Sequence, residues 1–257
     1  MTHGQCAILQ PQRYDLSALY KVQEKPSAQF LAAIPSFPSY LGMMKSQSLE
    51  LENVTALTLE HYNNRAEDFW QGTRDHDVSQ NINTLLQHMD GQAPFTILDF
   101  GCGPGRDLKT FAELGHAIIG LDGSSRFAAM ARERGFEVWE QNFLKLDLPN
   151  SRFDGIFANA SLFHVPSQEL PRVLTELGAT LKPDGVLFSS NPRGNNEEGW
   201  NNGRYGAYHD LEGWRGLMLG AGFSELAHYY RPAGLLREQQ NWLASVWRKG
   251  YTVGELR

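Results

Sequence analysis

Apolar residues along the chain follow two kinds of spacing, one helical and one of short continuous runs. Between residues 51 and 90 they recur at helical intervals, so "ALTLEHYNNRAEDFW" and "DVSQNINTLLQHM" each predict a helix. Asp77 or Ser79 would cap the second helix. Across residues 91–257, short apolar runs alternate with helical segments instead. We therefore expect a helical lid over residues 51–90 and an α/β core over residues 91–257.

The apolar runs of the core predict the strands of one sheet. Helical segments follow the runs "TILDF", "AIIGLD" and "FDGIFANA", and this alternation is typical of a mostly parallel sheet with helices on both faces. Two last runs, "SELAHYYRP" and "NWLASVWRK", are separated by too few residues for a helical crossover, so they should pair antiparallel. The expected fold is α/β: a Rossmann-like, seven-stranded, mostly parallel sheet with an antiparallel C-terminal strand and an N-terminal helical extension.

Two segments lack either spacing. Residues 1–50 carry scattered proline and serine, and Pro35 and Pro38 interrupt their apolar residues, so we expect an irregular N-terminal arm there. Residues 191–206 are rich in glycine and asparagine and follow the predicted strand "VLFSSNP". We expect a loop at the carboxyl edge of the sheet, where substrate contacts are usually found.

Composition and charge narrow the class of protein. The 257 residues suffice for one large domain with an extension, and the net charge of -6 argues against a general nucleic-acid binder. No apolar run approaches the length of a membrane span, and the first residues do not resemble a secretory signal. Cys6 and Cys102 are far apart and are interpreted as thiols in a reducing cytosol. We expect a cytoplasmic protein with no nucleic-acid or membrane partner, and the sequence leaves its oligomeric state open.

A glycine-rich loop follows the first predicted strand in "TILDFGCGPGRDLKTF". Gly101, Gly103 and Gly105 would let the backbone turn sharply and approach a ligand with no Cβ in the way. The helix that follows points its N-terminus, with its partial positive charge, at the same place. The loop therefore predicts a ligand site at the carboxyl edge of the sheet.

Acidic residues at the ends of two strands narrow the choice of ligand. The loop lacks the Gly-x-Gly-x-x-Gly spacing of dinucleotide-binding proteins, because its sixth position is Arg106. Asp122, at the end of the second strand, can accept both hydroxyls of a ribose. Asp99, just before the glycines, would be poorly placed against a pyrophosphate but suits a ligand with a cationic portion. These residues favour a nucleoside that also carries positive charge.

The motifs "LDFGCGPG", "GLDGS" and "FDGIFANASLFHV" resemble those of the class I S-adenosylmethionine-dependent methyltransferases. The resemblance covers about residues 62–248, is specific for fold and cofactor, and is weak for the substrate. It implies S-adenosylmethionine as cofactor and S-adenosylhomocysteine as product. By this resemblance, Asp99 would orient the cofactor's amino group and Asp122 would bind its ribose. The cofactor-binding residues expected on this basis are Tyr62, Trp70, Asp99, Gly101, Cys102, Gly103, Gly105, Asp122, Gly123, Ser124, Asn142, Phe143, Asn159 and Ala160.

Several of these positions also have ordinary structural explanations. Asn142 stands where the family often has an acid beside the adenine, and it could instead be a turn residue. Cys102 is better explained as a small loop filler than as a nucleophile. Tyr62 could simply be buried in the core instead of covering the cofactor.

The sequence offers two catalytic candidates, His164 and His209. Histidine has a suitable unperturbed pKa for a general base, which helps only if the acceptor carries a proton at neutral pH. His164 could equally be a helix-start histidine bound to backbone. We expect a methyltransferase for a small-molecule acceptor, with no metal. Two alternatives remain: a non-catalytic protein that binds the cofactor as a sensor or interaction partner, and a nicotinamide oxidoreductase on a similar sheet.

Overall fold

The computed structural model describes residues 37–250, with side chains from residue 49 onward. The chain divides into two compact units, residues 1–48 and residues 49–257. Everything below on packing and on the site concerns the second unit. Within residues 37–250, no helix combines the length and the apolar character that crossing a bilayer requires.

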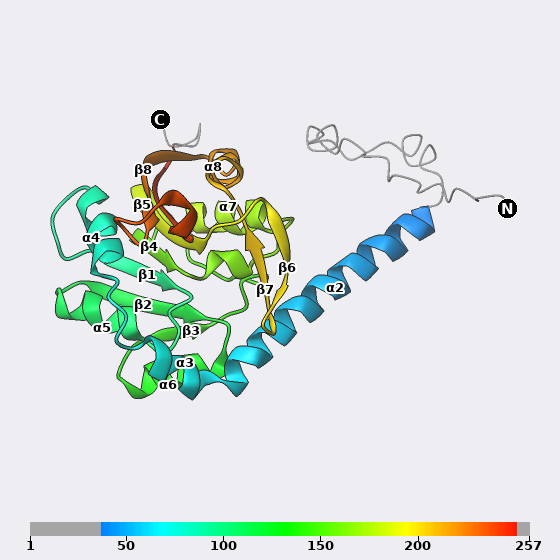
Figure 1. Cartoon of the computed structure of the whole chain (residues 1–257), viewed down its shortest axis with the longest axis horizontal. Helices are drawn as coiled ribbons and strands as arrows, with labels where there is room; N and C mark the ends of the chain where they lie inside the picture. The colour runs from blue at the N-terminus through cyan, green and yellow to red at the C-terminus, as the bar shows by residue number, and fades with distance from the viewer. Residues whose placement is uncertain (1–36, 251–257) are drawn as a thin grey trace. The chain divides into compact units, whose positions relative to one another are not determined.

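A seven-stranded sheet forms the centre of the second unit (Figure 1). Its strand order is β3-β2-β1-β4-β5-β9-β8, and β9 runs antiparallel to both of its neighbours while the other pairs are parallel. The predicted fold class is confirmed. The strands are β1 (Thr96–Phe100), β2 (Ala117–Asp122), β3 (Val138–Glu140), β4 (Phe153–Asn159), β5 (Leu181–Pro192), β8 (Phe223–Arg231) and β9 (Trp242–Lys249).

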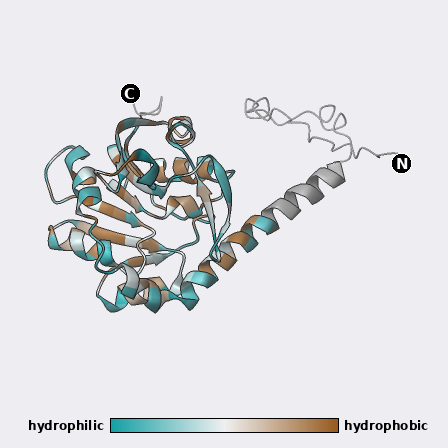
Figure 2. Ribbon diagram, viewed as in Figure 1, coloured by the Kyte–Doolittle hydropathy of each residue, from teal (hydrophilic) through white to brown (hydrophobic). Residues whose placement is uncertain are grey.

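Helices cover both faces of the sheet, and the alternation of side chains along each strand explains why. In β1, Ile97 packs in a cluster with residues of helices α4 and α5, while Leu98 and Phe100 pack in another with residues of α7 and α8. All three side chains are fully buried, as expected for strands of a parallel sheet. Figure 2 shows the hydrophobic colour concentrated on the central strands. The helices are α4 (Ser79–His88), α5 (Arg106–Glu113), α6 (Ser125–Glu133), α7 (Leu170–Thr180) and α8 (Leu211–Gly220).

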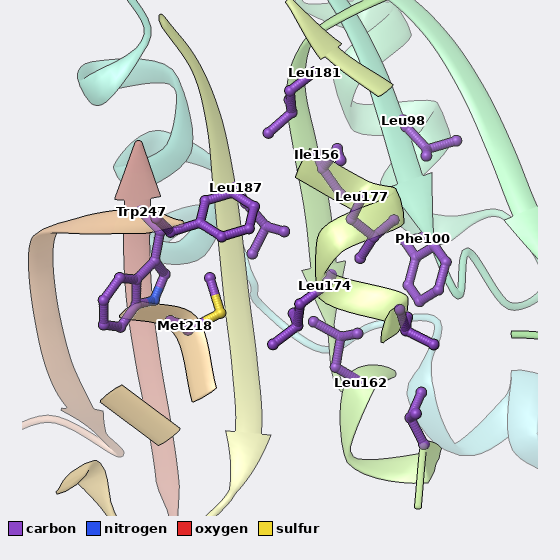
Figure 3. Close-up of a cluster of buried hydrophobic side chains, with 14 of the residues drawn as sticks. Leu98, Phe100, Ile156, Leu162, Leu174, Leu177, Leu181, Leu187, Met218 and Trp247 are labelled. Atoms are coloured by element: carbon purple, nitrogen blue, oxygen red, sulfur yellow. The ribbon is translucent and has the colours of Figure 1, made fainter. Parts of the chain in front are cut away.

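The larger cluster lies under α7 and α8 (Figure 3). At its edge, Ser245 of β9 receives hydrogen bonds from two indole nitrogens, those of Trp214 at 3.1 Å and Trp247 at 2.8 Å. The hydroxyl oxygens of Ser189 in β5 and Ser245 are 3.0 Å apart. Because the Ser245 oxygen already accepts two hydrogen bonds, Ser245 donates its own proton to Ser189. The buried hydroxyl pair thereby satisfies both tryptophans.

Residues 37–50 differ in conformation from the irregular arm expected there. Helix α2 (Phe37–Asn64) begins 14 positions before residue 51, so residues 37–50 are helical and not irregular. Pro38 lies in the first turn of the helix, where its missing N–H is not needed, so it starts this helix and does not interrupt it. The part of the predicted arm that spans residues 1–36 lies outside the described residues.

The glycine-rich segment after β5 was also predicted wrongly as a loop. It contains a separate two-stranded antiparallel hairpin, β6 (Glu197–Asn201) and β7 (Arg204–Tyr208). Asn202 and Gly203 connect the strands with positive φ at both positions, 50° and 81°, which is the conformation that asparagine and glycine favour in tight hairpins. The alternation of this segment was hidden by its many polar residues.

Candidate active site

A cavity of about 830 Å³ opens at the carboxyl edge of the sheet. Its walls come from α2, from α3 (Ala66–Thr73), from the loops after β1, β2 and β4, and from the hairpin. The order of the strands reverses between β1 and β4, which is the usual position of a ligand site in such sheets. Predicted residues that line the cavity are Tyr62, Trp70, Gly101, Cys102, Gly103, Asp122, Gly123, Phe143, Asn159, Ala160 and His164.

The glycine loop brings bare backbone to the cavity. Gly101 has φ of 81°, and a Cβ on it would lie 2.3 Å from the Cβ of Ser161. Gly103 has φ of 53° and an open approach, with Phe69 3.8 Å from its would-be Cβ. The first glycine is therefore required by close packing and the second by its backbone angle and by access to the cavity.

A buried charge network lies directly behind the loop. Arg106 holds the carboxylate of Asp107 with two hydrogen bonds, of 2.6 and 2.8 Å, and donates a third bond to the carbonyl of Thr73 in α3. Asn159 donates to the same carboxylate at 3.3 Å. The sequence places Arg106 and Asp107 immediately after the glycines, yet we did not predict them as cavity residues.

Asp99 is a buried carboxyl group in this region that lacks a hydrogen-bond partner on one oxygen. Its side chain is 1% exposed, and its Oδ2 has no hydrogen-bond partner among the described residues. Burial raises the pKa of Asp99 well above its usual range, and the nearby Asp107 and Asp122 carboxylates raise it further. A ligand ammonium group beside this carboxyl would relieve both effects, so the pocket fits a cationic ligand portion.

Asp122 is held ready by backbone donors. It accepts hydrogen bonds from the Gly103 nitrogen at 2.9 Å and the Ser124 nitrogen at 2.8 Å. Burial raises its pKa to about 6, against the effect of these backbone bonds. The carboxyl is therefore mostly ionised at neutral pH and can accept hydrogen bonds from a diol.

Another part of the cavity wall is formed by Tyr62, His164 and Arg204. The His164 Nδ1 lies 2.6 Å from the Tyr205 carbonyl, which can only accept, so Nδ1 carries the proton. The Nε2 then accepts the Tyr62 hydroxyl proton at 2.7 Å, and Arg204 donates to the same hydroxyl oxygen at 3.4 Å. Burial lowers the pKa of His164 to about 4, with a further contribution from Arg204. His164 is thus a neutral group that orients Tyr62.

Known proteins resemble this chain in sequence over the region that contains the glycine loop and the strands around it. Residues 97–185, from β1 into β5, match the family model described as a methyltransferase domain. A trans-aconitate 2-methyltransferase from Azoarcus is 34% identical over 105 residues, which cover 40% of this chain and 41% of that protein. An uncharacterized methyltransferase from Bacillus cytotoxicus is 26% identical over 43% of this chain and 53% of its own length. These matches and the fold support a class I S-adenosylmethionine-dependent methyltransferase. It spans about half the length of the curated relatives it matches first.

Solved structures agree with this fold. The 1,6-didemethyltoxoflavin-N1-methyltransferase of Burkholderia thailandensis, solved with S-adenosylhomocysteine bound, superimposes with a TM-score of 0.65 at 22% identity, over 78% of this chain and 91% of that chain. A putative methyltransferase from Haloferax volcanii, solved with its activator protein, gives 0.60 at 16% identity, over 74% and 98%. The cofactor of this family is S-adenosylmethionine, and the charged and glycine-lined half of the cavity has the chemistry to hold it.

Four of the predicted cofactor-binding residues do not line the cavity. Asp99 lies buried behind it, and Gly105 begins α5 and packs on Ala131. Ser124 caps α6 by accepting from the Phe127 nitrogen. Asn142 was expected beside the adenine, but its side-chain oxygen accepts from the Leu144 nitrogen, as a turn residue does.

His209 was expected as a catalytic candidate, and the structure does not support that role. Its Nε2 is buried with no hydrogen-bond partner among the described residues, its ring lies 6.2 Å from that of Trp214, and it does not line the cavity. Burial lowers its pKa as well. Cys102 is buried and free, with its thiol pKa raised by burial, which agrees with a filler and not a nucleophile.

Some cavity residues were beyond sequence reasoning. Leu59 and Thr58 of α2, Phe127 of α6, and Arg231 with Trp242 at the ends of β8 and β9 all reach the cavity through the fold. No local motif marks any of them. No cluster of three metal-binding side chains occurs in the part of the chain that the structure describes.

Proposed function

We propose that this chain transfers the methyl group of S-adenosylmethionine to a small-molecule acceptor. The observation that carries the proposal is the cavity, which combines a cofactor half lined by Asp122 and the glycine loop, with Asp99 buried behind them, and a second half lined by α2 and the hairpin. A pocket covered from several sides suits a metabolite better than a large polymer.

The residues of the cofactor half have separate tasks in this proposal. Asp122 accepts the ribose hydroxyls, Asp99 receives the ammonium group, and Gly101 and Gly103 leave room for the methionine portion. When bound, S-adenosylmethionine supplies a methyl group that is already activated by its positive sulfur. The chain then chiefly aligns the acceptor and excludes water, which can lower the barrier by roughly 7–11 kcal/mol in well-oriented cases.

The relatives support a methyltransferase but differ in acceptor. Their names refer to trans-aconitate, to a sterol, to a ubiquinone precursor and, for a probable enzyme of the mouse, to tRNA. The chain's net charge of -6 argues for a small molecule over the last of these.

Calorimetry and a transfer screen test the proposal together. S-adenosylhomocysteine should bind the chain, and NAD should not, because the loop lacks the third glycine at the dinucleotide spacing. Labelled methyl groups should then pass to one or more members of a metabolite panel and not to bulk tRNA. Cofactor binding with no transfer to any panel member would favour a sensor, and tight NAD binding would refute the proposal outright.

A further inference from the structure

The cationic side chains that line the cavity differ in whether a carboxylate neutralises them. Arg106 is held by Asp107 in an ion pair of 2.6 Å. Arg231 helps to lower the pKa of the nearby Asp77 carboxyl. Among the described residues, neither Arg231 nor Arg204 forms an ion pair with a carboxylate, but Arg231 donates to the backbone carbonyl of Asp77 at 3.1 Å. Arg204 is therefore a cavity guanidinium with no acidic residue paired to it, and a ligand can supply its counterion.

The neighbours of Arg204 add to this imbalance. Its guanidinium lies 5.8 Å from the centre of the Tyr62 ring. It also donates a hydrogen bond to the Tyr62 hydroxyl oxygen. Its charge also lowers the pKa of His61 and of His164, so both imidazoles favour the neutral form beside it. Arginine has five N–H donors, and most of these are left for a ligand.

The surroundings of Arg204 are built to accept a flat, polar group. Thr55 lines the same cavity with a buried hydroxyl that has no hydrogen-bond partner among the described residues. The apolar ring of Phe163 and the ring of Tyr208 form the wall beside it, 6.1 Å apart between centres. A guanidinium in such a half-dry site binds a carboxylate strongly, because its two parallel donors match the two oxygens.

We propose that the acceptor is a small organic acid whose carboxylate is bound by Arg204. This inference rests on the proposed function and specifies its substrate class. Asp122 gives the cofactor half of the cavity an ionised carboxylate, and Arg204 gives the wall beside Tyr62 a positive charge. The cavity therefore offers one group of each sign, for a cationic methyl donor and an anionic acceptor.

The test measures binding of matched acids and amides to the chain saturated with S-adenosylhomocysteine. The probes are a panel of aliphatic and aromatic carboxylic acids, each paired with its primary amide of the same shape. Titration calorimetry at pH 7.5 compares the native chain with Arg204→Met, which keeps the length of the side chain and removes the charge. Arg65→Met is the matched control, because Arg65, between α2 and α3, is exposed and does not line the cavity.

The expected result is that at least one acid binds the native chain about 10- to 100-fold more tightly than its amide, the range typical of a charge-assisted hydrogen bond. Arg204→Met should abolish that preference and leave the affinity for S-adenosylhomocysteine unchanged, and Arg65→Met should keep both. A panel in which no acid is preferred, or a preference that survives Arg204→Met, overturns the inference. Failure of S-adenosylhomocysteine itself to bind refutes the proposed function instead, so the two failures are distinguishable.

Discussion

At the scale of single residues, the site depends on carboxyl groups that are buried and poorly compensated. Asp99 has an oxygen without a partner, and Asp122 has a pKa raised to about 6 by burial. In a folded protein without ligand such groups are costly. A ligand that supplies an ammonium group and two hydroxyls offsets this cost, so these residues favour binding over the stability of the free chain.

The pH dependence of binding follows from Asp122. Only its ionised form accepts two hydroxyl hydrogen bonds, and its pKa is about 6. We expect the affinity for S-adenosylhomocysteine to be constant above pH 7 and to fall as the pH drops through 6. Asp122→Asn should weaken binding at pH 7.5 by about 1.5–3 kcal/mol and remove the fall near pH 6. Calorimetry from pH 5 to 8 measures both, with the exposed Asp147→Asn as control. An unchanged affinity in Asp122→Asn would exclude this residue from the ribose site.

Substitutions at two glycines with similar backbone angles distinguish the cost of backbone strain from the cost of overpacking. Gly101 and Gly115 have φ of 81° and 84°, but a Cβ on Gly101 meets Ser161 at 2.3 Å, while a Cβ on Gly115 meets nothing within 4 Å. Gly115→Ala should therefore cost about 1–2 kcal/mol of unfolding free energy through strain alone. Gly101→Ala should cost a further 1–3 kcal/mol through overpacking. Urea unfolding measures the two variants, and equal losses would contradict the packing argument.

At the scale of elements, a histidine joins three segments that close the cavity. His164 follows β4, its Nε2 bonds Tyr62 of α2, and its Nδ1 bonds the Tyr205 carbonyl of β7. Thr58 of α2 adds a hydrogen bond from the Tyr205 nitrogen at 3.0 Å. The helix, the hairpin and the loop after β4 are therefore held as one assembly by a few polar contacts.

This histidine predicts a loss of stability in mild acid. Its pKa is about 4 in the folded chain and 6.5 in a free side chain, so the unfolded chain binds the proton more readily between these values. The free energy of unfolding should fall as the pH drops below 6.5, by about 2 kcal/mol from this group at pH 5. His164→Gln should lose that part of the slope. Urea unfolding of both chains at pH 7 and pH 5 measures it, and identical slopes would show that His164 does not titrate in this range.

The hairpin predicts a separation of cofactor binding from methyl transfer. Asn201, Arg204 and Tyr208 reach the cavity from it, whereas the cofactor half comes from β1, β2 and the loops that follow them. Replacing residues 197–208 by a short Gly-Ser linker should keep the affinity for S-adenosylhomocysteine within about tenfold. Transfer to any acceptor that the native chain methylates should be lost. Loss of cofactor binding in a chain that still unfolds cooperatively would contradict this division.

At the scale of the whole molecule, the sheet could be predicted because its signals are local. Continuous apolar runs marked the strands, and the short gap before the last run indicated the antiparallel pairing of β8 and β9. Glycines and acids next to strand ends pointed to the cavity for the same reason. The hairpin was missed because exposed strands such as β6 carry no apolar alternation, with Trp200 and most of its neighbours outside the core.

The site was predictable in one half only. The residues of the cofactor half lie in short sequence motifs around Asp99, Gly101 and Asp122, so a local stretch of sequence is enough to identify them. Arg231 and Trp242 reach the cavity because β8 and β9 end there, and the Tyr62–His164 hydrogen bond joins residues 102 positions apart. Such contacts are set by topology, and single-sequence patterns carry no trace of them.

The division of the chain into two units predicts that the second one functions alone. The whole sheet and every described cavity residue belong to residues 49–257. A shortened chain that begins at Leu49 should unfold within about 2 °C of the full chain, since a change of 1 kcal/mol moves the midpoint of a domain of this size by roughly that much. Its affinity for S-adenosylhomocysteine should match that of the full chain. Scanning calorimetry and titration test both, and a lost cofactor site would assign a binding role to residues 1–48.

Four of the six tryptophans occupy two settings with different optical properties. Trp214 and Trp247 are almost wholly buried and share the oxygen of Ser245, while Trp70 and Trp242 border the cavity. An indole fixed in a dry core fluoresces at shorter wavelength than one touching water. The blue part of the emission thus reports the integrity of the core, and quenching of the emission of Trp70 and Trp242 by an added ligand reports occupancy of the cavity. One spectrum follows both events without any attached dye.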